Sequence, residues 1–404
     1  MATPMTDSRP ALPALTTLRL FAALAIVVHH CNGVFWPVAQ LGPLDAGVSF
    51  FFVLSGFILT YVYRDMLAGA ITQRGARWQF YRARLARIWP LHLICLLLTL
   101  LWLHVPEPFS APVLFANAAL LHAWIPWDRY FFSYNYASWS ISTELFFYAL
   151  FPWLIAAGAR MVLRGLLLSM LLVAGLVGLA YGLHLPSWAA TGQQLSSTGL
   201  LYGFPLARLS EFLLGVVCGM HFLSTRGVTS LDTPRLRSTL LECTALALLM
   251  LAFYALRFGL APWLHRLLLA LRLSTVAQVA PAQEAATLTA ISPLAGMFTR
   301  EWADHVCLAP FAAFLITVFA RQRGRLSRLL CAPWLVFGGE ISFALYLLHQ
   351  LALRLMQQYL TRFDASVFVI YLALILLGAA VLHLMVEQPA RRWLTHRSAV
   401  ARAR

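Results

Sequence analysis

Long apolar runs separated by short polar segments are the dominant pattern of this chain. A helix that crosses a lipid bilayer needs about 20 consecutive apolar residues, and about ten runs approach that length. We therefore predict an all-α polytopic membrane protein. The predicted spans are 17–36, 47–63, 86–105, 139–157, 162–184, 203–223, 239–256, 304–320, 334–354 and 366–388.

Two further apolar stretches do not fit a simple span. Residues 109–125 are short and flanked by proline, which favours a re-entrant or interfacial segment. Residues 258–273 mix arginine with leucine, which favours an interfacial helix on the outer face. Residues 185–202 are more polar and are predicted to form an outer loop.

The composition supports a membrane protein. Of the 404 residues, 61% are hydrophobic and only 11% are charged, whereas a soluble chain carries about 25% charged residues. The formal net charge of +15 could suggest nucleic-acid binding. We expect no nucleic-acid partner, because the arginines cluster in short segments between the apolar runs.

The placement of arginine also predicts the orientation. If the N-terminus is inside, all the arginine-rich segments fall on the cytoplasmic side, as the positive-inside rule requires. We therefore expect a multi-pass protein of the inner or plasma membrane, with both termini cytoplasmic. It would comprise an N-terminal tail (1–16), a transmembrane domain (17–390) and a basic tail (391–404). The basic tail could lie on the anionic inner leaflet or serve only as a topology signal.

The cysteines do not predict a metal site. Six cysteines are scattered through the chain, mostly inside apolar runs, and no C-x-x-C spacing occurs. We therefore expect no disulfide framework and no zinc site.

Arg19 and His30 are the first candidate functional residues. At 1.5 Å per helical residue, His30 lies roughly 16 Å beyond Arg19, near the bilayer midplane. Arg19 alone could be a snorkelling topology anchor, and His30 could be a packing residue. Ionisable groups inside a membrane are, however, often functional. His29 points about 100° away on the helix, so we expect only one of the two histidines to face a given cavity.

Arg84 and Arg87 form a second candidate site. They stand at i and i+3 on one helix face, and Arg82 lies off that face. Two adjacent guanidinium groups suit phosphate oxygens, which they can bind bidentately. A positive cluster that only sets the topology is the alternative.

The stretch WSISTELFFY holds a third candidate site. Glu144 lies about 8 Å into the outer half of its span, at a depth comparable to that of His30, and Ser140 and Ser142 surround it. A carboxylate near an imidazole would orient the ring and raise its basicity. A structural polar contact, or an ion pair with an arginine such as Arg208, is the alternative.

The other buried polar residues are weaker signals, and for each a structural role is favoured. Arg208 and Glu211 could neutralise each other at i, i+3, and Glu387 could pair with a cytoplasmic arginine. Glu340, Ser342 and His349 lie along the ninth span.

From Leu18 to about Trp393, the chain resembles the acyltransferase-3 family of integral membrane acyltransferases. The matching stretches, in chain order, are LRLFAALAIVVHH, VSFFFVLSGFIL, the R-x-x-R of Arg84 and Arg87, WSISTELFFY, ISFALYLLHQ and VEQP. In the first motif, arginine is followed by ten residues and then histidine, which selects His30. Two positions depart from the family pattern, because Ser49 and Leu145 replace residues that are often acidic.

The resemblance implies an acyl-CoA donor on the cytoplasmic side, with acetyl as the expected group, and an acceptor hydroxyl on the outer side. It implies that His30 is the catalytic base or an acylated nucleophile, and that Glu144 orients the imidazole or balances its charge. Arg84 and Arg87 would bind the phosphates of CoA, and Arg19 would neutralise CoA phosphate or stabilise the inner gate. We further expect Trp139, Ser140 and Ser142 to shape the acceptor pocket.

The resemblance leaves the acceptor open, with an envelope glycan, another carbohydrate or a secreted small molecule as candidates. No permanently bound cofactor is expected, and membrane lipid is the expected surrounding. Because the chain ends soon after the last span, we expect no fused esterase-like domain. A transporter or exporter is the alternative, since buried histidine, glutamate and arginine also mark transport paths. The sequence shows no inverted repeat to support it.

Overall fold

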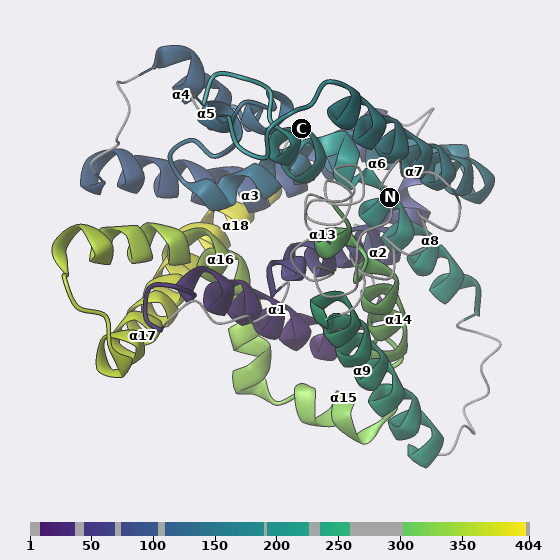
Figure 1. Ribbon diagram of the computed structural model, residues 1–404. Helices are drawn as coiled ribbons and strands as arrows, with labels where there is room; N and C mark the ends of the chain where they lie inside the picture. Colours follow the sequence, from purple (N-terminus) through teal and green to yellow (C-terminus); the bar gives the residue numbers. More distant parts are fainter. Residues whose placement is uncertain are drawn as a thin grey trace, which may run out of the picture.

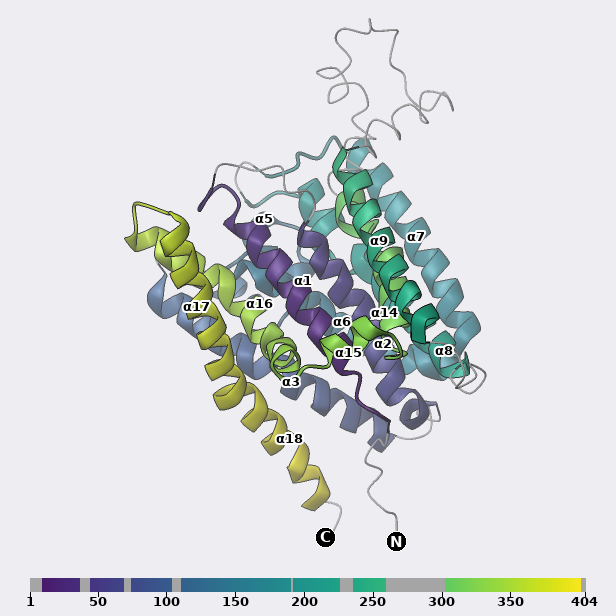
Figure 2. The same ribbon diagram turned by 90° about the horizontal axis from the view of Figure 1, so that it is seen from below.

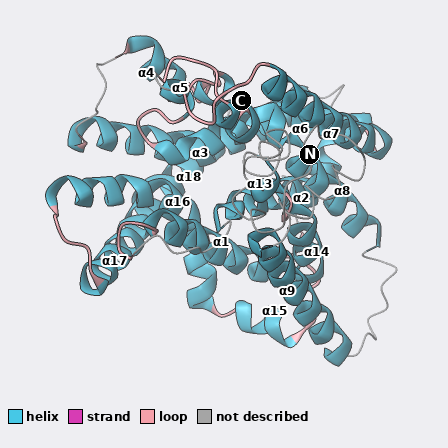
Figure 3. Ribbon diagram, in the orientation of Figure 1, coloured by secondary structure: helices cyan, strands magenta, loops and turns pink. Residues whose placement is uncertain are grey.

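The protein is a bundle of helices (Figures 1 and 3). The computed structural model describes residues 9–36, 44–68, 74–103, 110–189, 192–225, 235–258 and 302–400. Every regular element in these ranges is a helix. In a bilayer, a helix satisfies its own backbone hydrogen bonds, which explains why so apolar a chain forms helices. The predicted all-α class is confirmed.

Nine helical segments in the described ranges are long and apolar enough to cross a membrane. They are built on helices that match nine of the predicted spans. These are α1 (Pro13–Cys31), α2 (Gly47–Leu67), α3 (Arg74–Trp102), α6 (Trp139–Ala157), α7 (Ala159–Gly182), α8 (Leu209–Thr225), α9 (Arg235–Phe258), α16 (Pro333–Tyr359) and α17 (Ala365–Leu382).

The predicted span 304–320 is shorter in the structure than expected. It is divided into α13 (Asp304–Val306) and α14 (Ala309–Phe319). The 11 residues of α14 rise only about 16 Å, against a hydrocarbon core of about 30 Å. Pro310 at the start of α14 lacks the backbone N–H that would continue a helix from α13.

The stretch 109–125 is not a span, as predicted. It holds α4 (Ala111–Ala118), a turn with Leu120 at φ 57°, and a 3-10 turn at His122–Trp124. Asn117 and His122 are buried. The predicted interfacial helix 258–273 lies outside the described residues beyond Phe258. Within the predicted outer loop 185–202, the structure has a π-helical turn that starts at Gly199 and ends at Gly203.

The first and last described segments lie at the same end of the bundle (Figure 2). Arg9 donates hydrogen bonds to the backbone oxygen of Tyr61 and to Asp65, at the end of α2. Arg82, near the start of α3, donates to the backbone oxygen of Leu394 in α18 (Gln388–Val400). These contacts place the two described ends of the chain beside the same ends of α2 and α3, while the cytoplasmic orientation of that end stays a prediction.

Close approaches at glycine determine which helices are neighbours. A Cβ atom at Gly56 of α2 would overlap the backbone of Phe212 in α8. Likewise, a Cβ atom at Gly339 of α16 would overlap the backbone oxygen of Thr16 in α1. Small residues allow such contact between helices in a membrane. The second contact brings α1, which carries His30, against α16, which carries His349.

The remaining elements cover the edges of this core. Helix α15 (Arg325–Leu330) follows α14, and its first backbone N–H groups meet the buried carboxylate of Glu242 on α9. The exposed leucines of α7, such as Leu167 and Leu171, belong to the lipid-facing surface.

Candidate active site

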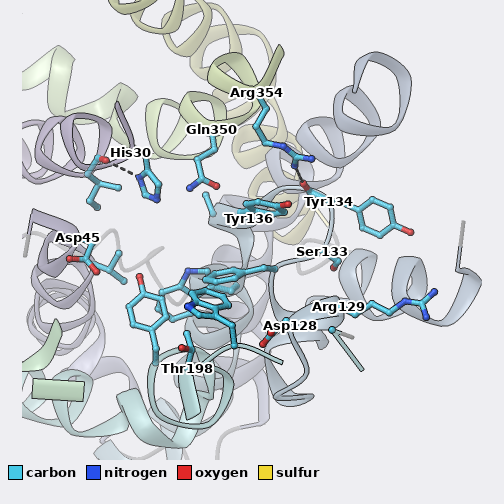
Figure 4. Close-up of a pocket in the computed structure, with 18 of the residues that line it drawn as sticks. His30, Asp45, Asp128, Arg129, Ser133, Tyr134, Tyr136, Thr198, Gln350 and Arg354 are labelled. Carbon is cyan, nitrogen blue, oxygen red and sulfur yellow. Dashed lines mark hydrogen bonds between the residues drawn. The ribbon is translucent and has the colours of Figure 1, made fainter. Parts of the chain in front are cut away.

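A large cavity of about 1070 Å³ has His30 in its lining (Figure 4). Aromatic rings form much of its wall, and polar and charged groups stand among them. The lining includes His29, His30, Asp45, Asp128, Arg129, Phe132, Tyr134, Tyr136, Trp139, Trp188, Tyr202, His305, Tyr346, Gln350 and Arg354. We call it the outer cavity.

A second, smaller cavity of about 240 Å³ lies among α1, α2, α3, α6 and α16. Its polar lining includes all three of the predicted donor-binding arginines. The polar residues are Thr16, Arg19, Ser55, Arg84, Arg87, Ser140, Glu144, Tyr148 and Tyr346. We call it the inner cavity.

The two cavities meet at Val48 and Tyr346, which line both. The Tyr346 hydroxyl lies 2.9 Å from Ser140 Oγ and donates to the backbone oxygen of Ala137 at 3.1 Å. Trp139 lines only the outer cavity and Ser140 only the inner one, so consecutive residues of α6 face different cavities. The wall between the cavities is therefore about one side chain thick.

His30 is half-buried in the wall of the outer cavity. Its Nδ1 atom lies 2.9 Å from the backbone oxygen of Ile26 and 3.2 Å from Nε2 of His349. His29 lines the same cavity, so the prediction that only one of the two histidines can face a cavity is wrong. The outer cavity is wide enough to contact both the His29 ring and the His30 ring.

Asp45 and His305 are polar residues of the outer cavity that the sequence did not single out. Asp45 Oδ2 lies 2.5 Å from Nδ1 of His305, and Asp45 Oδ1 lies 3.9 Å from Nδ1 of His29. The two residues are far apart in the chain and belong to no recognisable motif. Only the fold brings them together.

Glu144 does not contact His30 in the described structure. Its Oε1 atom accepts hydrogen bonds from Tyr148 at 2.5 Å and from Ser55 at 3.1 Å. Because the side chain points into the inner cavity, Glu144 faces the arginines rather than the imidazole. The predicted carboxylate–imidazole contact is therefore corrected: the direct partner of the His30 ring is His349.

The predicted pairing of Arg84 and Arg87 on one face is present in the inner cavity. Arg84 donates to the Tyr63 hydroxyl at 2.8 Å and lies over that ring, 5.0 Å from its centroid. Its buried Nε atom has no hydrogen-bond partner in the described part of the chain. Arg82 instead donates to the backbone of Leu394, which agrees with its placement off that face.

Ser142 lies outside both cavities, which corrects its predicted place in the acceptor pocket. Its hydroxyl donates to the backbone oxygen of Leu120 at 2.6 Å and accepts from the N–H of Ala123 at 3.4 Å. Ser142 therefore ties α6 to the turn at residues 120–123. The predicted place of Ser140 in the acceptor pocket is also wrong, because Ser140 lines the inner cavity. Of the three predicted residues, only Trp139 lines the outer cavity.

Other buried ions are paired, as the structural alternatives anticipated. Arg208 donates to Glu211 through Nε at 2.7 Å and through Nη2 at 2.9 Å, so it is not the partner of Glu144. Glu387 lies 2.9 Å from Nδ1 of His383 and 3.8 Å from Arg391.

Tyr202 lines the outer cavity. Burial raises its pKa well above the usual value for tyrosine, because a phenolate would lose its hydration there. The hydroxyl therefore stays protonated. No cluster of three or more histidine, cysteine, aspartate or glutamate residues suited to a metal ion occurs among the described residues.

Comparisons with known proteins identify the family of the chain. A family model described as an acyltransferase domain matches residues 12–384. The acyltransferase MdmB of Streptomyces mycarofaciens is 29% identical over 430 aligned positions, covering 97% of this chain and 95% of MdmB. The O-acetyltransferase OatA of Staphylococcus aureus is 32% identical over 157, covering 35% of this chain and 24% of OatA. No solved structure matches the chain.

Proposed function

The chain belongs to the acyltransferase-3 family, and from this premise we propose which donor, acceptor and residues its acyl transfer uses. The acyl group comes from acyl-CoA on the cytoplasmic side, with acetyl as the expected group. It is transferred to a hydroxyl of an envelope glycan or another acceptor outside the inner or plasma membrane. Membership of an acyltransferase family favours this reading over the transporter alternative.

One observation carries the proposal: a cavity holding an imidazole meets a cavity holding three guanidinium groups. The two substrates differ strongly in charge, since the CoA head group is rich in phosphate and the acceptor is a neutral alcohol. Separate cavities with a thin shared wall at Tyr346 suit such a pair. The reacting atoms would meet where the cavities join.

The arginine-lined inner cavity suits the phosphates of the donor. Arg19, Arg84 and Arg87 can together neutralise phosphate oxygens, and arginine binds such groups bidentately. The anionic head would stay at this end, and only the slim pantetheine arm would extend towards Tyr346. Glu144 limits the mutual repulsion of the arginines, so its role here is to balance charge.

The outer cavity suits a bulky acceptor that carries hydroxyl groups. Trp139 and Tyr202 present aromatic faces, whose centroids lie 4.6 Å apart, and Gln350 adds an amide. Aromatic walls with a few placed polar groups are typical of binding sites for such molecules. A sugar ring or another polyhydroxylated compound would fit this lining.

His30 acts as the general base in this scheme. It takes the proton of the acceptor hydroxyl, and the oxygen attacks the thioester carbonyl carbon. A C–O bond forms, the C–S bond breaks, and the CoA thiolate leaves and takes up the proton from His30. Base catalysis of this kind contributes about 10²–10⁴-fold. A relay through an acyl-histidine is the alternative, because imidazole is also a nucleophile.

The experiment uses purified protein in lipid vesicles with radiolabelled acetyl-CoA and envelope glycans as the acceptor probe. We expect release of free CoA that depends on the acceptor, and label in the glycan. Comparative mass spectrometry of glycans from wild-type and deletion strains identifies the acceptor by a lost acyl mass. Transport of label without any CoA release would overturn the proposal.

Variants separate the two cavities. His30→Gln should abolish turnover with normal membrane abundance, and near wild-type turnover would refute the base assignment. The double change Arg84→Gln with Arg87→Gln should raise the KM for acetyl-CoA. Arg82→Gln is the matched control, since Arg82 lies off that face. An unchanged donor KM in the double variant would count against the phosphate site.

A further inference from the structure

We propose that His349 is a positioning residue that fixes the tautomer of His30, so that Nε2 of His30 is the basic nitrogen. This inference rests on the proposed function, in which His30 is the base. It adds a residue from α16 to the reaction and says which ring nitrogen does the chemistry. The sequence suggested only a structural role for His349.

The position of His349 is set by its surroundings on α16. The residue is fully buried, and its Nδ1 atom lies 2.5 Å from the backbone oxygen of Tyr346. A carbonyl oxygen can only accept a hydrogen bond, so Nδ1 of His349 must carry the proton. In the neutral ring, Nε2 then has a lone pair and is an acceptor.

The acceptor nitrogen of His349 faces His30. The distance from His349 Nε2 to His30 Nδ1 is 3.2 Å, and the same Nδ1 lies 2.9 Å from the backbone oxygen of Ile26. Both neighbours of His30 Nδ1 are therefore acceptors. The Nδ1 atom must be the protonated one, which leaves the lone pair of His30 on Nε2.

This arrangement suits a base in two ways. The hydrogen bonds to the Ile26 oxygen and to His349 occupy Nδ1 of His30, whose ring lines the outer cavity (Figure 4), so Nε2 is left for the substrate. When Nε2 takes the proton of the acceptor substrate, the Nδ1–H of the resulting imidazolium keeps its hydrogen bonds to the Ile26 oxygen and to His349 Nε2. Without His349, the orientation would depend on one helix carbonyl, and the other tautomer would become accessible.

Other titratable groups surround the pair, but none of those in the described part of the chain has the geometry of His349. His29 meets the His30 ring edge to face at a centroid distance of 5.2 Å. Asp45 is engaged by His305 at 2.5 Å. On the far side of α16, the Tyr371 hydroxyl donates to the backbone oxygen of His349 at 3.0 Å and so does not compete for its ring.

Two substitutions separate the two nitrogens of His349. Asparagine places an amide near Nδ1 and keeps a donor to the Tyr346 carbonyl, but it offers nothing at Nε2. Glutamine is longer, and its side-chain oxygen can take the place of Nε2 as the acceptor for His30. His349→Asn therefore keeps the structural bond and loses the positioning bond, and His349→Gln restores the latter.

We expect His349→Asn to lower kcat by about 10- to 100-fold, less than the loss from removing the base itself. Both KM values should stay unchanged, and the thermal unfolding temperature of His349→Asn should stay near that of the wild type, because the bond to the Tyr346 carbonyl is kept. His349→Gln should recover most of the lost kcat. Equal, wild-type turnover in the two variants would overturn the inference.

The tautomer itself is read by nitrogen NMR of protein labelled with ¹⁵N-histidine, with the His30 signals assigned by their loss in His30→Gln. Wild-type protein should show a protonated Nδ1 at His30, and His349→Asn should show a mixture. A protonated Nε2 in the wild type would refute the assignment. This measurement needs no turnover. If His30→Gln were fully active while the wild-type protein showed a protonated Nδ1 at His30, the proposed function would fail and the pairing would stand.

Discussion

Replacing Arg208 tests how this fold tolerates charge in its interior. The side chain is 1% exposed, and it binds Glu211 bidentately at 2.7 and 2.9 Å. Its Nη2 also donates to Ser49 at 3.1 Å. The guanidinium lies 5.5 Å from the centroid of Trp139 and 5.3 Å from that of Tyr202, both of which line the outer cavity.

The change Arg208→Met would leave the Glu211 carboxylate buried without its partner. Breaking one side of a buried ion pair costs about 3–5 kcal/mol, because the remaining charge has neither water nor counter-charge. Replacing both residues, as in Arg208→Met with Glu211→Leu, removes that charge. The double variant should then lose only about 1 kcal/mol, the contribution of the hydrogen bond to Ser49.

The assay is equilibrium unfolding in detergent micelles, followed by tryptophan fluorescence. Arg164→Met on α7 is the control, because Arg164 is exposed and should change stability by no more than about 0.5 kcal/mol. The expected order of stability is wild type and control, then the double variant, then the single variant. A double variant as unstable as Arg208→Met would show that the lost packing of the arginine, and not the unpaired charge, sets the cost.

Three further changes have definite expected outcomes. Gly324→Ala should destabilise the fold by about 0.5–2 kcal/mol, because its Cβ would overlap the Glu242 carboxylate that caps α15. Gly175→Ala is the control and should leave the stability unchanged, because its Cβ would meet nothing within 4 Å. The midpoints of unfolding of the two variants are the measurement. Ser142→Ala should lower the stability by about 1 kcal/mol, and the KM for the acceptor in the transfer assay should stay unchanged. A changed KM would show that Ser142 belongs to the acceptor pocket. Burial lowers the pKa of His122 to about 3, so below about pH 6.5 the unfolded state binds more protons than the folded state, and the stability should fall as the pH drops from about 6.5 to about 3. His122→Gln should reduce this loss of stability between melts recorded at about pH 7 and pH 4.5. An unchanged loss of stability in the variant would refute the assignment.

Sequence reasoning about the site succeeded where a pattern is local. The spacing of Arg84 and Arg87 predicts a shared helix face, and the structure has both in one cavity. It failed for Glu144, whose depth resembles that of His30 but whose side chain faces the inner cavity. Helical rise gives depth from residue numbers, but the direction of a side chain depends on which helices lie around it.

The sequence by itself determined that this protein is an all-α membrane bundle with a histidine and a glutamate inside its spans. The reason is that hydrocarbon offers the backbone no hydrogen bonds, so long apolar runs must be helical and the few polar residues among them stand out. Only the tertiary structure decided that His30 meets His349, 319 residues away. That contact depends on the close approach of α1 and α16 at Gly339, a property of two packed surfaces that neither segment carries alone.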